Sequence, residues 1–237
     1  MVCPEEKIFF IHLPKCGGSA VEMFLLDRFN YNIEACNILC AHFSKINVDR
    51  GWTIQNVVHL PYQKQKKICH SGKIYIDDSW LKFTIVRNPY NRISSELAWQ
   101  ISFPTSRNLY YLRTHKEKQY MFNVDQNRFF REDPLHNNWF NHKLPMSKLL
   151  DFGKEENVKI HKYEEGLDNI IKQYFDVPSN FKLKRINDPQ VDNGISEKID
   201  YRTLWTKSFI ENCNTFYKED FERFGYEMLN PNDYPEF

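Results

Sequence analysis

Two short stretches of the sequence combine positive charge, small residues and hydroxyl groups in the way that anion-binding sites need. The first, PKCGGS, contains Lys15, the glycine pair Gly17 and Gly18, and Ser19. Glycine lets backbone N–H groups approach a ligand closely, lysine adds a full positive charge, and serine adds a hydroxyl donor. Together these residue types favour binding of a phosphate or sulfate group.

The second stretch, RNPYNRISS, begins at Arg87 and ends at Ser95. The fork of an arginine suits a phosphate dianion, and a serine hydroxyl adds a neutral donor. The structural alternative is a helix-capping or salt-bridge role for Arg87 and a packing role for Ser95. Between them, Arg92 is expected to pair with Glu96, four residues further on, or with another nearby carboxylate.

The elements around the first stretch form a strand, a tight turn and a helix. The apolar run Ile8–Ile11 is typical of a buried strand in a parallel sheet. After the glycines, Ser19 is predicted to be the N-cap of a helix that opens with Ala20 to Leu26. In this arrangement the free N–H groups and the positive end of the helix dipole converge on one spot.

The second stretch lies at a junction of the same kind. Trp80–Val86 is predicted to be a strand, Asn88 an N-cap, and Pro89 the first residue of a helix that runs to about Ile101. Because ligands of open α/β sheets bind at the carboxyl ends of strands, Arg87 is expected at the ligand site. A short helix is expected from Tyr62 and a short strand at 56–59.

The two stretches resemble motifs of the sulfotransferases that use 3′-phosphoadenosine 5′-phosphosulfate (PAPS). PKCGGS resembles the PKTGGT/S loop of the carbohydrate 2-O- and 6-O-sulfotransferases and their bacterial relatives, with cysteine where threonine is usual. RNPYNRISS resembles their RNP-x-x-R-x-x-S signature. Weaker similarity extends to three segments nearer the C-terminus: KLPMSKL (143–149), VKIHKYE (158–164) and FYKEDFERFGY (216–226).

The resemblance implies a donor site made of two phosphate-binding parts. The 3′-phosphate is expected on Arg87 and Ser95. The 5′-phosphosulfate is expected on the loop and the helix start, at Lys15, Cys16, Gly17, Gly18, Ser19 and Ala20. The implied reaction is transfer of a sulfuryl group from PAPS, without a metal, to a hydroxyl or an amine of a saccharide or small-molecule acceptor, with release of adenosine 3′,5′-bisphosphate (PAP).

The implied fold is a single sulfotransferase domain over residues 1–237. It is a three-layer, P-loop-like α/β domain in which helices flank a mostly parallel central sheet. An aromatic segment at about 99–145 is expected to be an insertion that shapes the acceptor cleft. The alternative for this segment is a helical subdomain with a small core of its own.

The reaction also needs a base for the acceptor's proton and a cation for the leaving phosphate. In the 2-O-sulfotransferases a histidine between the two motifs is the base, so His59 is predicted for this role and Lys15 for the second. A structural histidine beside a turn is the alternative for His59. His42 is the next candidate, then His12 and Glu96. Three histidines of the presumed acceptor region are also candidates to touch substrate: His115, His136 and His142.

Two other functions remain open. A nucleotide- or glycan-binding protein of the same fold without turnover is kept open by Cys16. A variant P-loop kinase is less favoured, because the common nucleotide motif places lysine after the second glycine, whereas Lys15 precedes both glycines.

Composition narrows the remaining possibilities. A formal charge of +1 argues against a nucleic-acid partner. Cys36, Cys40 and His42 lie close together, but no second pair has zinc-ligand spacing, so no metal is expected and ordinary buried thiols are favoured. Neither a signal peptide nor a transmembrane run is evident, so no membrane partner is expected. We expect a cytoplasmic protein of a bacterium or virus, with a trimmed Golgi-type enzyme as the alternative.

Overall fold

The computed structural model describes residues 1–30, 60–102, 130, 140–152, 156–184 and 200–236. Contacts divide the chain into two compact units, each built from two segments: Met1–Arg87 with Met146–Ile186, and Asn88–Pro145 with Asn187–Phe237. The single domain over 1–237 with an insertion at about 99–145 stays a prediction, and most of that insertion lies outside the described residues.

A mostly parallel sheet forms the centre of the first unit. Its described strands lie in the order β1 (Val2–Cys3), β2 (Ile8–Ile11), β3 (Leu81–Val86) and β4 (Val158–Lys162). β1 runs antiparallel to β2, whereas β2, β3 and β4 are parallel. The carboxyl ends of these three strands therefore meet at one edge of the sheet, and the predicted α/β class is confirmed.

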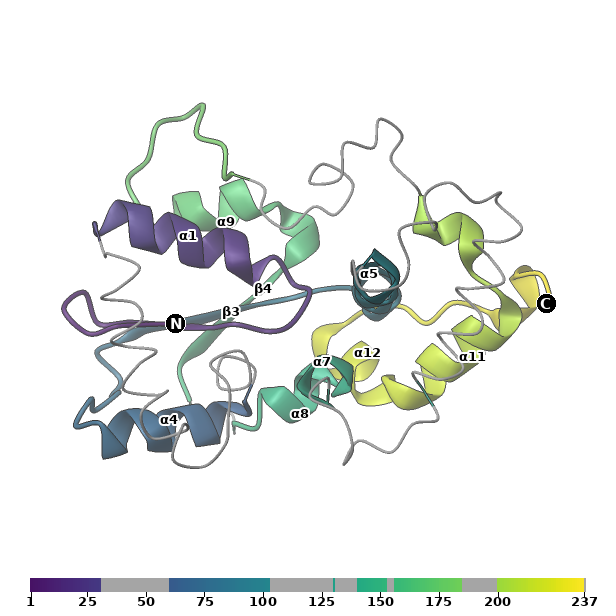
Figure 1. The fold of residues 1–237 in the computed structure, drawn as a ribbon, viewed down its shortest axis with the longest axis horizontal. Coiled ribbons are helices and arrows are strands. Elements are labelled where there is room, and N and C mark those ends of the chain that lie inside the picture. Colours follow the sequence, from purple (N-terminus) through teal and green to yellow (C-terminus); the bar gives the residue numbers. More distant parts are fainter. Residues whose placement is uncertain (31–59, 103–129, 131–139, 153–155, 185–199, 237) are drawn as a thin grey trace. The chain divides into compact units, whose positions relative to one another are not determined.

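Helices cover both faces of this sheet (Figure 1). On one face lie α1 (Gly18–Arg28) and α9 (Leu167–Tyr174), and on the other lies α4 (Tyr62–Ser71). Successive side chains of a strand point to opposite faces, so each strand packs on both helix layers. Phe9 stacks on Tyr62 of α4 with ring centroids 5.6 Å apart, whereas Phe83 lies 5.2 Å from Tyr174 of α9. Burial on both sides explains why Ile8–Ile11 is apolar throughout.

The helix of the second stretch begins where the sequence predicts. α5 (Pro89–Ser102) starts at Pro89, and the Asn88 side-chain oxygen accepts a hydrogen bond from the N–H of Tyr90 at 3.1 Å. Asn88 is therefore the N-cap, as predicted. The predicted strand over Trp80–Val86 begins one residue later, and the predicted strand at 56–59 lies outside the described residues.

The second unit is helical in its described part. It contains α5, α7 (Phe140–Lys143), η4 (Tyr201–Leu204), α11 (Lys207–Phe216), α12 (Lys218–Phe224) and η5 (Pro231–Asp233). One apolar cluster joins α5 to the helices near the C-terminus, with Tyr90, Ile93 and Leu97 of α5 buried among its members. The Tyr90 ring lies 4.9 Å from that of Phe221 in α12.

Candidate functional site

The loop between β2 and α1 contains two residues in the left-handed conformation. The φ angle is 64° at Lys15 and 81° at Gly17. Gly17 is also the N-cap of α1, which begins at Gly18 and has no side-chain cap. The predicted N-cap at Ser19 is therefore wrong. The helix starts two residues earlier than predicted because glycine reaches the left-handed conformation at little steric cost, and Ser19 lies in the first turn.

Both loop glycines are crowded by side chains from other parts of the first unit. A Cβ atom on Gly17 would lie 2.8 Å from Leu167 Cδ1 and 3.0 Å from a ring carbon of Tyr163. A Cβ atom on Gly18 would lie 2.2 Å from the ring of His12. Glycine is therefore required at Gly17 by backbone angle and by space, and at Gly18 by space.

Some N–H groups of the loop already have partners within it. The N–H of Cys16 donates to the carbonyl oxygen of Leu13 at 3.4 Å, and the N–H of Ala20 donates to Gly17 at 3.2 Å. The first turn of a helix lacks intrahelical acceptors for its N–H groups. With no side-chain cap, the start of α1 can therefore offer N–H groups of its first turn to an anion.

The side chain of Cys16 faces the protein interior. Cys16 is only 1% exposed, and its sulfur lies 3.8 Å from the sulfur of Met146, in α8 (Met146–Leu149). The thiol also lies 3.5 Å from the carbonyl oxygen of Pro14. The contribution of residue 16 to the exposed side of the loop therefore comes from its backbone.

Arg87 reaches the same loop from the end of β3. Its Nη1 donates to the carbonyl oxygen of Lys15 at 3.0 Å, and its guanidinium carbon lies 4.6 Å from the centre of the Tyr163 ring. Its Nε is buried and has no hydrogen-bond partner among the described residues. A buried donor without an acceptor costs stability, so this edge of the guanidinium suits an anionic oxygen.

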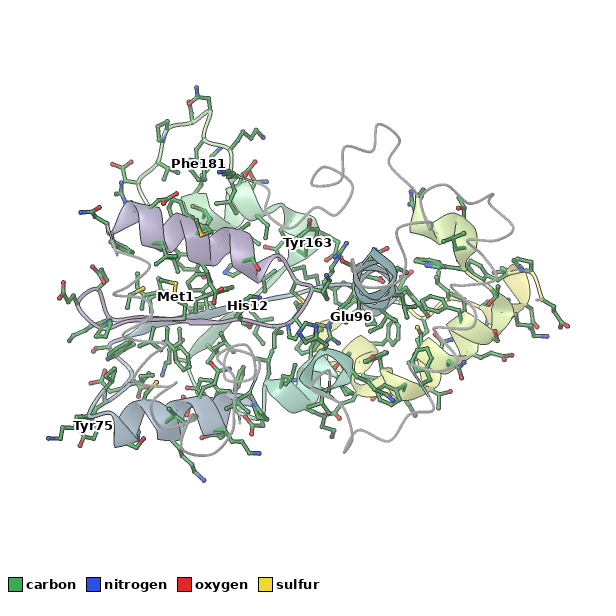
Figure 2. The ribbon with its side chains drawn as sticks, in the orientation of Figure 1. Met1, His12, Tyr75, Glu96, Tyr163 and Phe181 are labelled. Carbon is green, nitrogen blue, oxygen red and sulfur yellow. The ribbon has the colours of Figure 1, made fainter. Side chains whose placement is uncertain are left out.

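A contact between His12 and Glu22 also supports the loop. The Nδ1 atom of His12, which is buried, lies 3.0 Å from a carboxylate oxygen of Glu22 in α1. The other carboxylate oxygen lies 3.8 Å from the amino nitrogen of Met1. Burial raises the pKa of Glu22, but the interaction with His12 outweighs it and the net pKa is lowered. In Figure 2, His12 and Tyr163 both lie beside the loop that leads into α1.

Ser95 lies in the second unit, half-buried in α5. Two of its neighbours in α5, Arg92 and Glu96, are fully buried and both contact His142. Arg92 Nη2 donates to the carbonyl oxygen of His142 at 3.0 Å, and a Glu96 oxygen lies 2.9 Å from the His142 ring. The guanidinium carbon of Arg92 lies 5.9 Å from the Tyr217 ring. The pairing of Arg92 with Glu96 stays a prediction.

A comparison with known families decides which family these features belong to. The family model described as "Sulfotransferase family" matches residues 1–227, nearly the whole chain. The chain belongs to the sulfotransferase family. No curated protein and no solved structure matches it.

In this sulfotransferase the predicted phosphate residues divide between the two units. Lys15 to Ala20 and Arg87 belong to the first unit, and the loop and Arg87 are joined by a hydrogen bond. Ser95 belongs to the second unit, so its place in the donor site stays a prediction. The predicted base, His59, and its rival His42 lie outside the described residues.

The contacts of three residues were not foreseen from the sequence of this sulfotransferase. Tyr163 lies against Gly17 and Arg87, His12 against Gly18, and Met146 against Cys16. The only sequence signal for Tyr163 was its place in the KYE segment at the end of a predicted strand. The described residues contain no group of three or more His, Cys, Asp or Glu that could hold a metal ion. Among the helices that the structure describes, none has the length and apolar character to cross a membrane.

Proposed function

We propose that this sulfotransferase transfers the sulfuryl group of PAPS to a hydroxyl or an amine of a saccharide or small molecule, and releases PAP. The observation that carries the proposal is the set of contacts around the Arg87 guanidinium. Its guanidinium is fixed between the Lys15 carbonyl and the Tyr163 ring, and its buried Nε has no partner among the described residues. We assign the 3′-phosphate to this group, and a contact of the donor with Ser95 stays a prediction.

The loop suits the 5′ end of the donor. The start of α1 has no side-chain cap, so an anion can serve as the acceptor that its first turn lacks. The N–H groups of the first turn and the positive end of the helix dipole favour negative charge there. Lys15 adds a full charge from the same loop.

When bound, PAPS supplies a sulfuryl group: the bond from sulfur to the 5′-phosphate oxygen breaks as the acceptor's bond to sulfur forms. Lys15 stabilises the charge that grows on the leaving phosphate, and His59 accepts the proton of the acceptor. Positioning and charge stabilisation supply most of the rate in such transfers, as in phosphoryl transfer. No metal is assigned a role.

The acceptor is assigned only by class. Aromatic residues make up 16% of the chain and are frequent between residues 99 and 139. Sugars and flat small molecules both bind well against aromatic walls. The choice between them, and between a hydroxyl and an amine, rests on an acceptor screen.

Calorimetry with PAP tests the donor site. Arg87→Ala should weaken PAP binding by roughly 1.5–3 kcal/mol, because a set of charge-assisted hydrogen bonds is lost. Arg202→Ala is the matched control, since Arg202 is an exposed arginine in a surface ion pair with Asp200. Equal PAP affinity in the parent and in Arg87→Ala would remove the 3′-phosphate assignment.

A screen of saccharides and small molecules with radiolabelled PAPS tests turnover. Transfer of label to any of them supports the enzyme. PAP binding without transfer to any acceptor points instead to a binding protein of the sulfotransferase fold. Magnesium-dependent phosphate transfer from ATP would identify a kinase.

A further inference from the structure

We propose that His12 and Glu22 are positioning residues of the donor site, and that His12 compensates the Glu22 carboxylate, which would otherwise repel the donor. This inference rests on the proposed function. Neither residue is placed in contact with the reacting atoms. Their role is to hold the loop in place and to determine how much negative charge lies near the start of α1.

The first step of the argument is where the imidazole lies. His12 follows β2 directly and is the first residue of the loop, and Gly18 is the first residue of α1 after the loop. The ring of His12 occupies the space that a side chain on Gly18 would need, since a Cβ there would meet ring atoms at 2.2 to 2.7 Å. The imidazole therefore packs the two ends of the loop against each other.

The second step is what holds the ring. Glu22 lies four residues after Gly18, so its side chain emerges on the same face of α1. Its carboxylate lies 3.0 Å from Nδ1 of His12, and the His12 side chain is 9% exposed against 23% for Glu22. The ring is thus fixed between the helix backbone and a carboxylate on the next turn.

The third step is why the loop needs such support. Lys15 and Gly17 are both left-handed, and this conformation costs roughly 1–2 kcal/mol for a residue with a Cβ, as at Lys15. Arg87 holds the Lys15 carbonyl, and Tyr163 and Leu167 cover Gly17. The pair of His12 and Glu22 is the support at the base of the loop.

The fourth step concerns charge. A carboxylate in the second turn of α1 stands close to the helix start, which is where the donor's anionic group is proposed to bind. Its field opposes the favourable field of the helix dipole and of Lys15. The His12 ring and the amino group of Met1 both lie against this carboxylate, so loss of His12 leaves the carboxylate with one partner fewer and strengthens its repulsion of the donor.

Charge compensation makes a prediction that packing alone does not. His12→Gln should raise the PAP dissociation constant roughly tenfold, because the Glu22 carboxylate then lacks the imidazole that lies against it. The double variant His12→Gln/Glu22→Gln should regain affinity to within about threefold of the parent, because the opposing charge is gone. Glu22→Gln alone should bind PAP at least as tightly as the parent. The weakening in His12→Gln should shrink at high salt.

Lys66→Gln is the matched control. Lys66 forms a 2.6 Å ion pair with Glu156 in the same unit but extends from α4, on the other face of the sheet (Figure 1). This variant should lose stability and keep PAP affinity within about twofold of the parent. A double variant as weak as His12→Gln, or weaker PAP binding in Glu22→Gln, would overturn the inference.

A second measurement tests the packing without using the donor. Gly18→Ala should lower the melting temperature clearly in the parent and much less in a His12→Ala background, where the ring is absent. An equal cost in both backgrounds overturns the role of His12 at the base of the loop. A parent that does not bind PAP overturns the proposed function and this inference together, whereas a parent that binds PAP with His12→Gln unchanged overturns the inference alone.

Discussion

Arg87 shows how neighbours restrict what one side chain can do. One nitrogen is bonded to the Lys15 carbonyl and one face of the guanidinium lies over Tyr163, so the fork keeps only a limited set of orientations. A lysine at this position would keep the charge but would lose both the planar stacking and the fixed donor geometry. The chemistry proposed for residue 87 therefore depends on arginine and not on charge alone.

Gly17 supports a prediction at the same scale. Gly17→Ala should destabilise the protein by more than the roughly 1–2 kcal/mol expected for a left-handed alanine, because the new Cβ also clashes with Leu167 and Tyr163. Urea unfolding of the variant measures this cost.

A Leu167→Ala background separates the two effects. Leu167 Cδ1 is the atom nearest to the new Cβ, at 2.8 Å, and it is absent in that background. Gly17→Ala should therefore cost less stability there than in the parent, while the backbone strain stays the same. An equal cost in both backgrounds would show that crowding by Leu167 contributes nothing.

His59 carries the prediction for the base. His59→Ala should keep PAP affinity and lower turnover by roughly 10²–10⁴-fold, the usual contribution of a positioned proton acceptor. The rate of the parent should rise with pH through an apparent pKa near the ordinary histidine value of about 6.5. A melting curve must accompany the kinetics, and His70→Ala, a change at an exposed histidine of α4, is the control. Parent-like turnover in folded His59→Ala would move the assignment to His42.

Among the elements, the two helix layers of the first unit are each tied to the sheet by a buried or half-buried carboxylate. Glu22 joins α1 to the end of β2 through His12. Glu156, just before β4, contacts Lys66 at 2.6 Å and the Tyr62 hydroxyl at 2.8 Å, both in α4. Lys82 of β3 lies 3.5 Å from the same carboxylate. Burial raises the pKa of Glu156, but these partners outweigh it and the net pKa is lowered.

These two carboxylates predict how stability depends on pH. Because both pKa values are lowered on folding, the contribution to stability is fully present above the ordinary carboxyl pKa, 4.5, and is lost as the pH falls below it through the folded-state pKa. The urea midpoint should therefore stay level from pH 7 to about pH 5 and decrease below that.

Glu156→Gln isolates one of the two contributions. The variant should have a lower urea midpoint than the parent at pH 7, because the ion pairs of the carboxylate with its lysine partners are lost. Its urea midpoint should also decrease less than that of the parent as the pH falls below 5. A variant with the full acid dependence of the parent would show that Glu156 has the same pKa in the folded and unfolded states.

For the whole molecule, two units share one chain and each is assembled from two separate segments.

A ligand that binds only the folded protein stabilises it by mass action. PAP at about a hundredfold excess over its dissociation constant should add about 2.7 kcal/mol to the unfolding free energy.

The same melting experiment tests the absence of a metal from the proposed site. Excess EDTA should not change the shift produced by PAP, since the proposed donors are backbone N–H groups, Lys15 and Arg87. Magnesium added back to the treated protein is the control. A shift that disappears with EDTA and returns with magnesium would contradict a metal-independent donor site.

Local sequence determined the elements that form the site. The apolar run Ile8–Ile11 became β2 with the predicted bounds, and Asn88 and Pro89 began α5, because these signals act between residues close in the chain. The two motifs were likewise sufficient to indicate the sulfotransferase family. The predicted N-cap of α1 was wrong by two residues, since the sequence alone does not decide whether a serine or a glycine precedes the first helical residue.

Tertiary structure decided which side chains complete the loop. Tyr163 lies on Gly17 and Arg87, and Met146 lies on Cys16, although these residues are far apart in the sequence. His12 is a candidate base by sequence, and in the structure its ring lies against Gly18 and Glu22. Parallel strand pairing brings these distant segments to one edge of the sheet. Which residues then touch depends on register, backbone angles and the space that each glycine leaves, none of which can be read from a local pattern.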